Sequence, residues 1–261
     1  LLIGTPFFVV FGSLSDKIGR KPIILAGCAI AALTYFPLFQ ALTHYANPAL
    51  YRAVQNSPVT LTVDQSQCTF QFNPTGTAKF TSSCDIAKQM LAANSANYNT
   101  VSGTGPAVIQ IGDKTITVVG AKDLPPDEFK AKEAALKKEI GAALKSAGYP
   151  TKADPAQMNL PMVIAILALL VIFVTMVYGP IAAALVELFP TRIRYTSMSL
   201  PYHIGNGWFG GLLPTIAFAL VAQNGNIYYG LWYPVIIAAG TFVIGLFFLP
   251  ETKDRDIYAA D

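Results

Sequence analysis

A polar, glycine-rich face lies within an otherwise apolar stretch, residues 196–222. Its members recur at helical spacing, so they would share one side of a helix: His203, Asn206, Gly207, Gly210 and Pro214. An ionisable side chain within a membrane span is a candidate functional site, and an imidazole changes charge near neutral pH. His203 could therefore bind a carboxylate or relay a proton. The alternative is a neutral histidine hydrogen-bonded to another helix, with the glycines allowing backbones to approach.

A second candidate for chemistry is Tyr178, which precedes Gly179-Pro180 in the apolar stretch 160–188. Proline lacks a backbone donor and clashes with the preceding turn, so Pro180 predicts a kink that could gate a cavity. The Tyr178 hydroxyl could contact a substrate, although tyrosines of membrane proteins also pack or lie at the interface. Apart from Glu187, at the end of the stretch 160–188, no acidic residue lies within the complete predicted spans, so a carboxylate that carries a coupling proton is expected outside this chain.

Helices that cross a membrane must position these residues. The chain has 261 residues, of which 53% are hydrophobic and only 13% charged, against about 25% charged in an average soluble domain. Long stretches without Asp, Glu, Lys or Arg can each hold spans of about 20 residues. We expect a truncated helix rather than a signal peptide at 1–11, and complete spans at 22–43, 160–188, 196–222 and 229–249.

The segment 45–159, between the first two complete spans, is polar and has a pattern of its own. Alternating apolar and polar residues predict strands, the last two forming a hairpin: 60–72, 108–111 and 115–118. Residues 125–147 predict an amphipathic helix, because prolines and acidic residues begin it and Gly148 follows it. We therefore expect a small α+β domain inserted between membrane helices.

Two cysteines, Cys68 and Cys84, lie in this segment, whereas Cys28 lies in a predicted span. An oxidising compartment would let the first two form a disulfide, and two unpaired thiols are the alternative. The segment has no histidine, metal-ligand spacing or nucleophile motif, so we expect neither an enzyme nor a bound cofactor or metal. The net charge of +3 indicates no nucleic-acid partner.

Basic residues in the short loops predict the orientation, because lysine and arginine favour the cytoplasmic side. They precede the first complete span, separate the second from the third, and follow the last: Lys17, Arg20, Lys21, Arg192, Arg194, Lys253 and Arg255. Segment 45–159 and the uncharged turn 223–226 would then lie on the opposite side. We expect a cytoplasmic C-terminus and an extracytoplasmic segment 45–159.

Three loop sequences resemble motifs of the major facilitator superfamily. They are Gly12-Ser13-Leu14-Ser15-Asp16-Lys17-Ile18-Gly19-Arg20-Lys21-Pro22, then Glu187-Leu188-Phe189-Pro190-Thr191-Arg192-Ile193-Arg194-Tyr195, and then Pro250-Glu251-Thr252-Lys253. The first resembles the signature loop of the superfamily. The second resembles the loop after the tenth helix of its metabolite:proton symporters and sugar porters, and the third resembles the ending of the same carriers. Segment 45–159 departs from the pattern, because that loop is normally short.

The resemblance implies the C-terminal half of an all-α polytopic carrier, with a small α+β domain inserted between its ninth and tenth helices. The implied divisions follow the chain in four parts. Residues 1–44 would hold the end of the eighth helix, the signature loop and the ninth helix, and residues 45–159 would form a periplasmic domain. Residues 160–250 would form the tenth to twelfth helices, and residues 251–261 a cytoplasmic tail. The protein would lie in a bacterial inner membrane. Its partners would be the lipid bilayer and a six-helix N-terminal half of the same protein.

The resemblance also implies roles for the loop residues. An ionic cluster at the cytoplasmic face would close an inner gate. Its expected members are Asp16, Arg20, Glu187, Arg192 and Arg194, and Arg20 is expected to pair with Glu187. Gly12 and Gly19 would permit close helix approach and a tight turn beside Lys21. The alternative is that these charges only anchor the topology. The tenth and eleventh helices would line the cavity.

These observations predict secondary active transport of a small metabolite, either an organic acid or a zwitterion, by alternating access with proton symport. The alternative is a transporter-like receptor or assembly protein that binds a ligand or a partner through segment 45–159. The resemblance does not fix the substrate.

Overall fold

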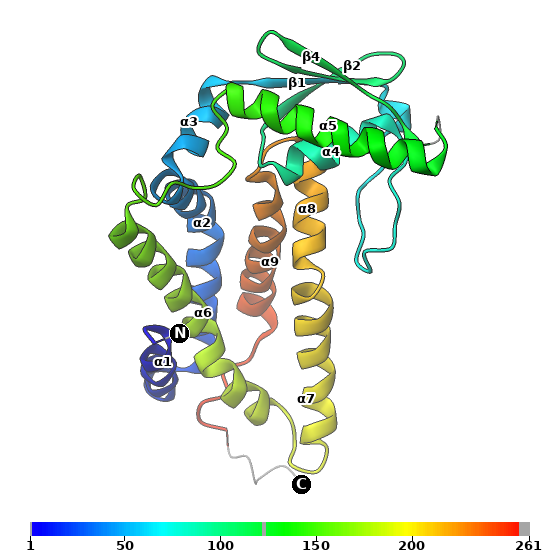
Figure 1. Cartoon of the computed structure of the whole chain (residues 1–261). Coiled ribbons are helices and arrows are strands. Elements are labelled where there is room, and N and C mark those ends of the chain that lie inside the picture. Colours follow the sequence, from blue (N-terminus) through cyan, green and yellow to red (C-terminus); the bar gives the residue numbers. More distant parts are fainter. Residues whose placement is uncertain (1, 122–123, 256–261) are drawn as a thin grey trace. The chain divides into compact units, whose positions relative to one another are not determined.

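The computed structural model describes residues 2–121 and 124–255, and the chain divides into two compact units (Figure 1). The first, which we call the helical unit, comprises Leu1–Leu38, Pro161–Leu213 and Leu231–Asp261. The second, which we call the mixed unit, comprises Phe39–Leu160 and Pro214–Gly230. The unit boundaries fall within helical elements, so those elements contribute residues to both units.

The apolar helices agree with the predicted spans. They are α1 (Gly4–Ile18), α2 (Arg20–Ala46), α6 (Leu160–Leu188), α7 (Arg194–His203), α8 (Leu213–Asn224) and α9 (Trp232–Phe248). A short 3₁₀ turn, η4 (Tyr229–Leu231), precedes α9. In the described part of the chain, four helical stretches are long and apolar enough to cross a membrane: Arg20–Ala46, Leu160–Leu188, Arg194–Asn224 and Tyr229–Phe248.

Helix α1 extends well beyond the predicted end at residue 11. Gly12 lies inside the helix, where its carbonyl oxygen accepts a hydrogen bond from the Ser15 hydroxyl over 2.6 Å. The turn into α2 is made by Gly19 alone, whose φ of 112° is a conformation that side chains rarely adopt. Most of the predicted signature loop is therefore helical.

The predicted span 196–222 is not one regular α-helix. A π-helix, η3 (Ile204–Gly210), follows α7, and α8 begins at Leu213. Glycines permit this change, since a Cβ atom on Gly211 would collide with the Gly207 carbonyl oxygen. A π-helix holds more residues per turn than an α-helix. The prediction that His203, Asn206, Gly207, Gly210 and Pro214 share one face by α-helical spacing is therefore wrong.

The mixed unit contains a four-stranded sheet of order β2-β1-β3-β4. Its strands are β1 (Val59–Val63), β2 (Tyr98–Ser102), β3 (Ala107–Ile111) and β4 (Lys114–Val118). Strands β1 and β2 are parallel, whereas β3 is antiparallel to both β1 and β4. The β3–β4 hairpin agrees with the prediction. The strand predicted over 60–72 ends at Val63, because the Asp64 carboxylate accepts from the Ser66 backbone over 3.0 Å and begins η1 (Gln65–Gln67).

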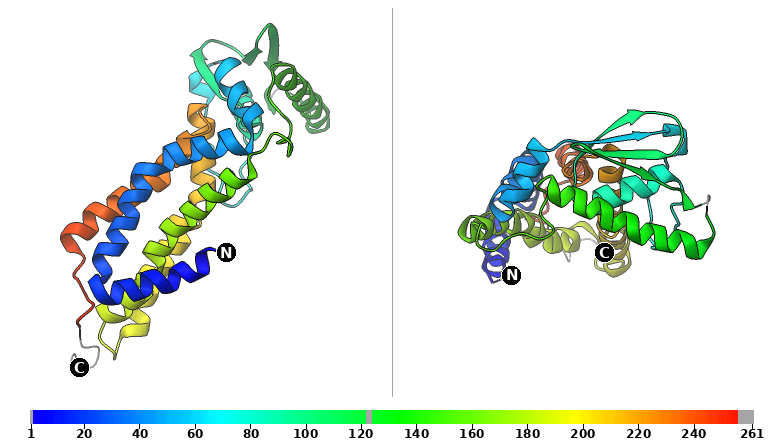
Figure 2. Two further views of the ribbon diagram at one scale, coloured as in Figure 1. Left: turned by 90° about the vertical axis from the view of Figure 1, so that its left-hand side faces the viewer. Right: turned by 45° about the horizontal axis from the view of Figure 1, so that its top comes forward.

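Helices α4 (Ser83–Ala93) and α5 (Pro126–Ser146) cover one face of this sheet (Figure 2). Helix α5 agrees with the predicted amphipathic helix, whereas α4 and α3 (Pro48–Asn56) were not predicted. Leu61 and Ile109 of the sheet and Leu91 of α4 are fully buried in the core. Cys68 and Cys84 form a disulfide.

The end of α8 belongs to the mixed unit, because strand β2 and helix α4 bind it. The Tyr98 backbone N–H donates to the Gly225 carbonyl oxygen over 2.9 Å, and the buried Tyr98 hydroxyl donates to the carbonyl oxygen of Ala222. The Lys88 ammonium donates to the Gln223 carbonyl oxygen over 3.4 Å, near the C-terminal end of the helix dipole. Burial lowers the pKa of Lys88.

Candidate functional site

Arg20, the first residue of α2, is the centre of an ionic cluster in the helical unit. Only 10% of its side chain is exposed. Its Nη2 donates to Glu187 Oε1 over 2.9 Å, and its Nε lies 3.3 Å from each Glu187 carboxylate oxygen. Its Nη1 donates to the buried Ser15 hydroxyl over 2.6 Å and pairs with Asp16. Charge-assisted bonds of this forked type are stronger than neutral ones and fix the geometry.

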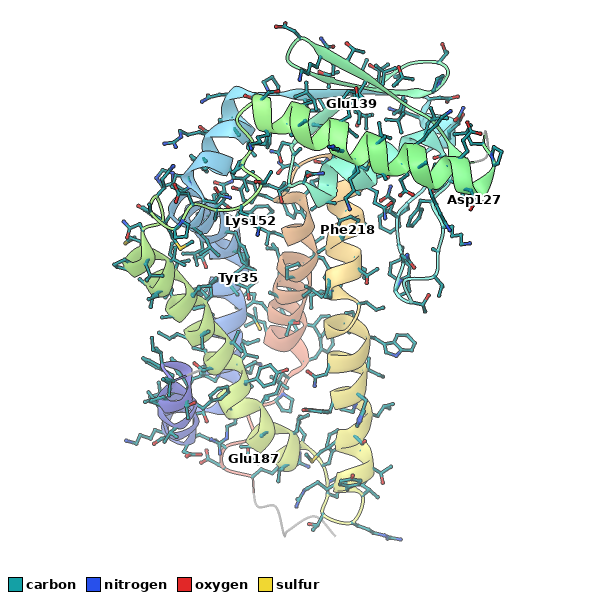
Figure 3. All side chains as sticks on the ribbon, viewed as in Figure 1. Tyr35, Asp127, Glu139, Lys152, Glu187 and Phe218 are labelled. Carbon is teal, nitrogen blue, oxygen red and sulfur yellow. A yellow bond between two sulfur atoms is a disulfide. The ribbon has the colours of Figure 1, made fainter. Side chains whose placement is uncertain are left out.

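Glu187, in the last turn of α6 (Figure 3), joins this cluster to the segment after α9. Its side chain is 12% exposed. Its second oxygen, Oε2, accepts a hydrogen bond of 2.6 Å from the hydroxyl of Thr252, a residue that is 2% exposed. Each of the three loop motifs thus contributes to one cluster, through Arg20, Glu187 and Thr252.

Glu251 caps the N-terminus of α2. Its Oε1 accepts from the Arg20 backbone N–H over 2.9 Å, and its Oε2 accepts from that of Lys21 over 3.1 Å. The backbone N–H groups of Thr252 and Lys253 also donate to Oε1. Burial raises the pKa of Glu251, but these four donors outweigh burial and the net pKa is lowered. The cap is therefore charged at neutral pH and weakens only as the pH falls through that lowered value.

Ser15, Glu251 and Thr252 are members of the cluster that the sequence analysis did not place in it. For Glu251 and Thr252 the sequence did carry a signal, because the motif Pro250-Glu251-Thr252-Lys253 ends the apolar stretch. Nothing in that motif alone indicates which helix end its carboxylate contacts. Only the folded chain brings it to the start of α2.

Two predicted members of the cluster lie apart from its carboxylates or make other contacts. Arg192 is exposed, and it makes no ion pair among the residues that the structure describes. Arg194 donates from Nε to the Phe189 carbonyl oxygen over 3.1 Å, just beyond the end of α6. Lys21 donates from Nζ to the Leu246 carbonyl oxygen over 2.9 Å, near the end of α9.

Glycine allows α1 and α6 to approach closely. A Cβ atom on Gly179 would lie 3.2 Å from the Phe8 carbonyl oxygen and 3.3 Å from the Gly12 nitrogen. Helix α6 continues through Pro180, which is buried. The Gly179-Pro180 pair is therefore a packing point for α1, in addition to being the site of the predicted kink.

Two of the predicted cavity residues contact each other. The Tyr178 hydroxyl of α6 donates to the Asn206 side-chain oxygen of η3 over 2.7 Å, and both side chains are exposed. The His203 ring nitrogen Nδ1 lies 2.7 Å from the Ser199 carbonyl oxygen, one turn earlier in its own helix. Gly207 lies in the π-helix, and a Cβ atom added to it would have no neighbour within 4 Å. Breaks of this kind in a helix are frequent at functional sites.

Replacing Gly19 with alanine is expected to displace Glu251 from the start of α2. A Cβ atom there would collide with Glu251 Oε2, and the positive φ adds strain of about 1–3 kcal/mol. We expect a lower midpoint of thermal unfolding for the full-length protein in detergent. Gly240→Ala is the matched control, because Gly240 of α9 has no neighbour within 4 Å of that position. Equal midpoints for the two variants would contradict the role given to Gly19.

Comparison with known proteins finds that parts of this chain are similar to transporters. Residues 141–261 match the family described as "Sugar (and other) transporter". A Haemophilus influenzae protein named for metabolite transport is 40% identical over 81 residues, which are 30% of this chain and 17% of that protein. The glycine betaine/proline/ectoine/pipecolic acid transporter OusA of Dickeya dadantii is 33% identical over 94 residues, 36% of this chain and 18% of the relative.

A third relative, the inner membrane metabolite transport protein YhjE of Escherichia coli strain K12, is 32% identical over 96 residues, 37% of this chain and 21% of the relative. No solved structure matches the chain. The matched part thus spans between 17% and 21% of the length of these three relatives.

Four helical stretches in the described part of the chain are long and apolar enough to cross a membrane, and residues 141–261 are similar to a family of transporters. The three relatives are all named as transport proteins, and the loop motifs of this chain resemble those of the major facilitator superfamily.

Proposed function

We propose that the full-length protein is a secondary active transporter that carries a small metabolite, an organic acid or a zwitterion, with a proton by alternating access. This chain would supply the end of the eighth helix and the ninth to twelfth helices. A six-helix N-terminal half would supply the rest of the cavity and the carboxylate that carries the proton. Two relatives support this substrate class, since one is named for betaine and proline and the other for metabolites.

The observation that carries the proposal is the pairing of Arg20 with Glu187, which joins the start of α2 to the end of α6. We place this end of the helical unit at the cytoplasmic face, where the cluster would close the inner gate in the outward-facing state. The pair is more buried than a surface ion pair, so it is worth more than the ~0–1 kcal/mol of an exposed bridge. A contact of this strength can still break once in each transport cycle.

In the same proposal, the tenth and eleventh helices line the cavity. The hydrogen bond between Tyr178 and Asn206 would then be a point where substrate competes for two polar groups. His203, nearby in sequence, would present its remaining ring nitrogen to substrate or proton. The sheet-containing part of the mixed unit would be an α+β domain inserted between the ninth and tenth helices and exposed to the periplasm of a bacterial cell, where the disulfide is favoured.

The test is uptake of labelled oxoglutarate, citrate, shikimate, proline and betaine by cells that express the full-length gene. Each compound is measured with and without a protonophore, and in sodium-free medium. We expect one of these compounds to accumulate, and we expect the protonophore to abolish accumulation while removal of sodium has no effect. Cells that carry the empty vector are the control.

Other outcomes would overturn parts of the proposal. Accumulation that survives the protonophore but requires sodium would leave transport standing and contradict proton coupling. No uptake of any compound, with the protein present and correctly inserted, would contradict transport of this substrate class. That result would favour a receptor or assembly protein that binds a ligand or partner through the mixed unit.

A further inference from the structure

The segment that the disulfide closes, residues 69–82, forms a long loop within the mixed unit, and we call it the disulfide loop. It lies between Cys68 and the start of α4, and it contains neither helix nor strand. Figure 1 shows the loop, in cyan, running alongside α8. The loop and α8 from Pro214 onward belong to the same compact unit, so their placement relative to each other is defined.

The disulfide loop faces the first turns of α8 across a small cavity of about 300 Å³. Side chains of both segments line it, among them Asn73, Phe80, Pro214, Thr215 and Phe218. Figure 3 shows Phe218 on α8. The tip of the loop is therefore beside the beginning of α8, not beside its end at Asn224.

Hydrogen bonds fix the loop in this position at its start and at its tip. The Thr69 backbone N–H and hydroxyl donate to the two carboxylate oxygens of Asp85, each over 2.8 Å, and Asp85 is buried in the first turn of α4. At the tip, the Asn73 side chain bonds both backbone groups of Ala78, over 3.1 and 3.3 Å. The disulfide adds a covalent closure, which reduces the conformations that the loop can adopt.

Thr215 lies well inside the helical stretch that is long and apolar enough to cross a membrane, Arg194–Asn224. It is nine residues before Asn224, which is about 14 Å at a rise of about 1.5 Å per residue. Because the polar pair Gln223-Asn224 ends the apolar stretch, the membrane surface is expected near it. The hydrocarbon core of a bilayer is about 30 Å thick. The tip of the disulfide loop therefore reaches the depth of the outer half of that core.

Lipid cannot surround the loop at this depth. Irregular backbone occurs within the hydrocarbon region only where protein buries it or where it lines a water-filled cavity, because lipid offers no hydrogen bonds. Residues 74–79 at the tip are exposed. Their side chains include the Thr75 and Thr77 hydroxyls, which lie 2.7 Å apart, and the ammonium of Lys79. Polar groups of this kind at membrane depth mark a path that contains water.

We propose that the disulfide loop lines the water-filled extracytoplasmic entrance of the carrier, beside α8, and that Lys79 draws the carboxylate of the substrate into that entrance. This inference rests on the proposed transport function and deepens it. Lys79 carries the only charge of the loop, is exposed, and makes no ion pair with any residue that the structure describes. An unpaired cation at an entrance raises the local concentration of anionic groups. Organic acids and zwitterions both carry a carboxylate.

The first measurement asks what surrounds the tip, and it needs no transport. A nitroxide spin label is attached to Ala78→Cys in the full-length protein in nanodiscs, a change that keeps the backbone groups bonded by Asn73. Collisions of the label with a water-soluble nickel chelate are compared with its collisions with oxygen, which concentrates in lipid. We expect the nickel chelate to dominate. Phe247→Cys, at an apolar position of α9 that is 74% exposed, is the control for lipid, where oxygen should dominate.

Uptake then separates an entrance from open solvent. A bulky, membrane-impermeant maleimide on Ala78→Cys is expected to lower the initial rate of uptake at least about fivefold, because it obstructs the path. The same adduct on Thr115→Cys, exposed on β4, is the matched control and should leave uptake unchanged. Intact Cys68–Cys84 bonding in Ala78→Cys shows that its loop has folded.

The charge of Lys79 is tested by the split between KM and the maximal rate. Lys79→Gln is expected to raise the KM for the transported compound at least about threefold, because attraction of the carboxylate is lost. The maximal rate should not change, since Lys79 lies outside the proposed cavity. Lys79→Arg keeps the charge and should keep the KM of the wild type. Added salt should raise the KM of the wild type more than that of Lys79→Gln.

Three results would overturn the inference. A label on Ala78→Cys that collides mainly with oxygen, or with neither agent, would contradict the water-filled entrance. Normal uptake with the bulky adduct at that position would place the loop outside the path of the substrate. An unchanged KM in Lys79→Gln would contradict the role of its charge. The spin-label result does not depend on uptake, so failure of the entrance can be told apart from failure of the transport proposal.

Discussion

Replacing Arg20 with alanine in the full-length protein is expected to lower the initial rate of uptake by at least about tenfold. The change leaves the Glu187 carboxylate, 12% exposed, without its cation. Removing one partner of a buried ion pair costs about 3–5 kcal/mol, and each 1.4 kcal/mol shifts a conformational equilibrium about tenfold. That cost falls only on the states in which the cluster is closed, so the variant would populate those states less and complete the transport cycle more slowly. The measurement is uptake of the transported compound, divided by the amount of protein in the membrane.

Two further variants separate gating from general damage. Glu187→Ala added to Arg20→Ala removes the uncompensated charge, and we expect it to restore part of the lost uptake because the two sites are energetically coupled. Lys132→Ala breaks an exposed pair, in which Lys132 Nζ and Glu128 Oε1 are 3.4 Å apart and both side chains are 53% exposed. Such a pair is worth little, so uptake should not change. Wild-type uptake by Arg20→Ala would exclude the cluster from the gate.

The apolar spans could be predicted from the sequence because a membrane helix is specified by composition. Stretches without charge lie at the spans and their ends are marked by charged or polar residues. The end of α1 could not be predicted in this way. Their residue types would place Gly12 and Ser15 in a loop. In the structure the Ser15 hydroxyl donates to the Gly12 carbonyl oxygen and the helix continues to Ile18. The actual turn depends on the backbone conformation of Gly19, which composition does not show.

Helix α4 was missed although its start signal is present. Ser82 accepts a hydrogen bond from the Asp85 backbone over 3.0 Å, as a helix-capping serine does. The strand pairing of β2 is harder to foresee, because its residues alternate poorly in burial and its partner β1 lies on the other side of α4 in sequence. Long-range pairing depends on packing of the whole unit rather than on local pattern.

Part of the ionic cluster could be predicted because opposite charges recur at motif positions. The sequence analysis placed Arg20 and Asp16 in one cluster and named Glu187 as the partner of Arg20, although the Gly19 turn separates the helices of Asp16 and Arg20. Glu251 could not be assigned, because its role is to bond backbone N–H groups at the start of α2. Backbone donors leave no signature in the residue types that supply them. The π-helix was not foreseen because it, too, is defined by backbone hydrogen bonds rather than by residue types.

Gly225 carries the second large expected effect, because it fixes the contact between the end of α8 and strand β2. Its φ is 88°, and a Cβ atom there would collide with the Tyr98 carbonyl oxygen and lie 2.9 Å from Tyr98 Cδ2. Tyr98 cannot move away, since it is buried and its backbone N–H already donates to the Gly225 carbonyl oxygen. Gly225→Ala is expected to open this contact, with strain of about 1–3 kcal/mol before the clash is counted.

Hydrogen exchange of the full-length protein measures that opening. We expect the peptides that contain Tyr98 and the end of α8 to exchange at least about tenfold faster in Gly225→Ala. Gly141→Ala, on α5 with no neighbour within 4 Å of the new atom, is the matched control and should leave those peptides protected. Unchanged exchange in Gly225→Ala would show that the contact does not hold α8. Because α8 continues the span that contains Asn206, the uptake of this variant tests whether the contact matters for transport. A fall in uptake would tie the hold of the mixed unit on α8 to transport, whereas normal uptake would show that transport does not depend on this contact.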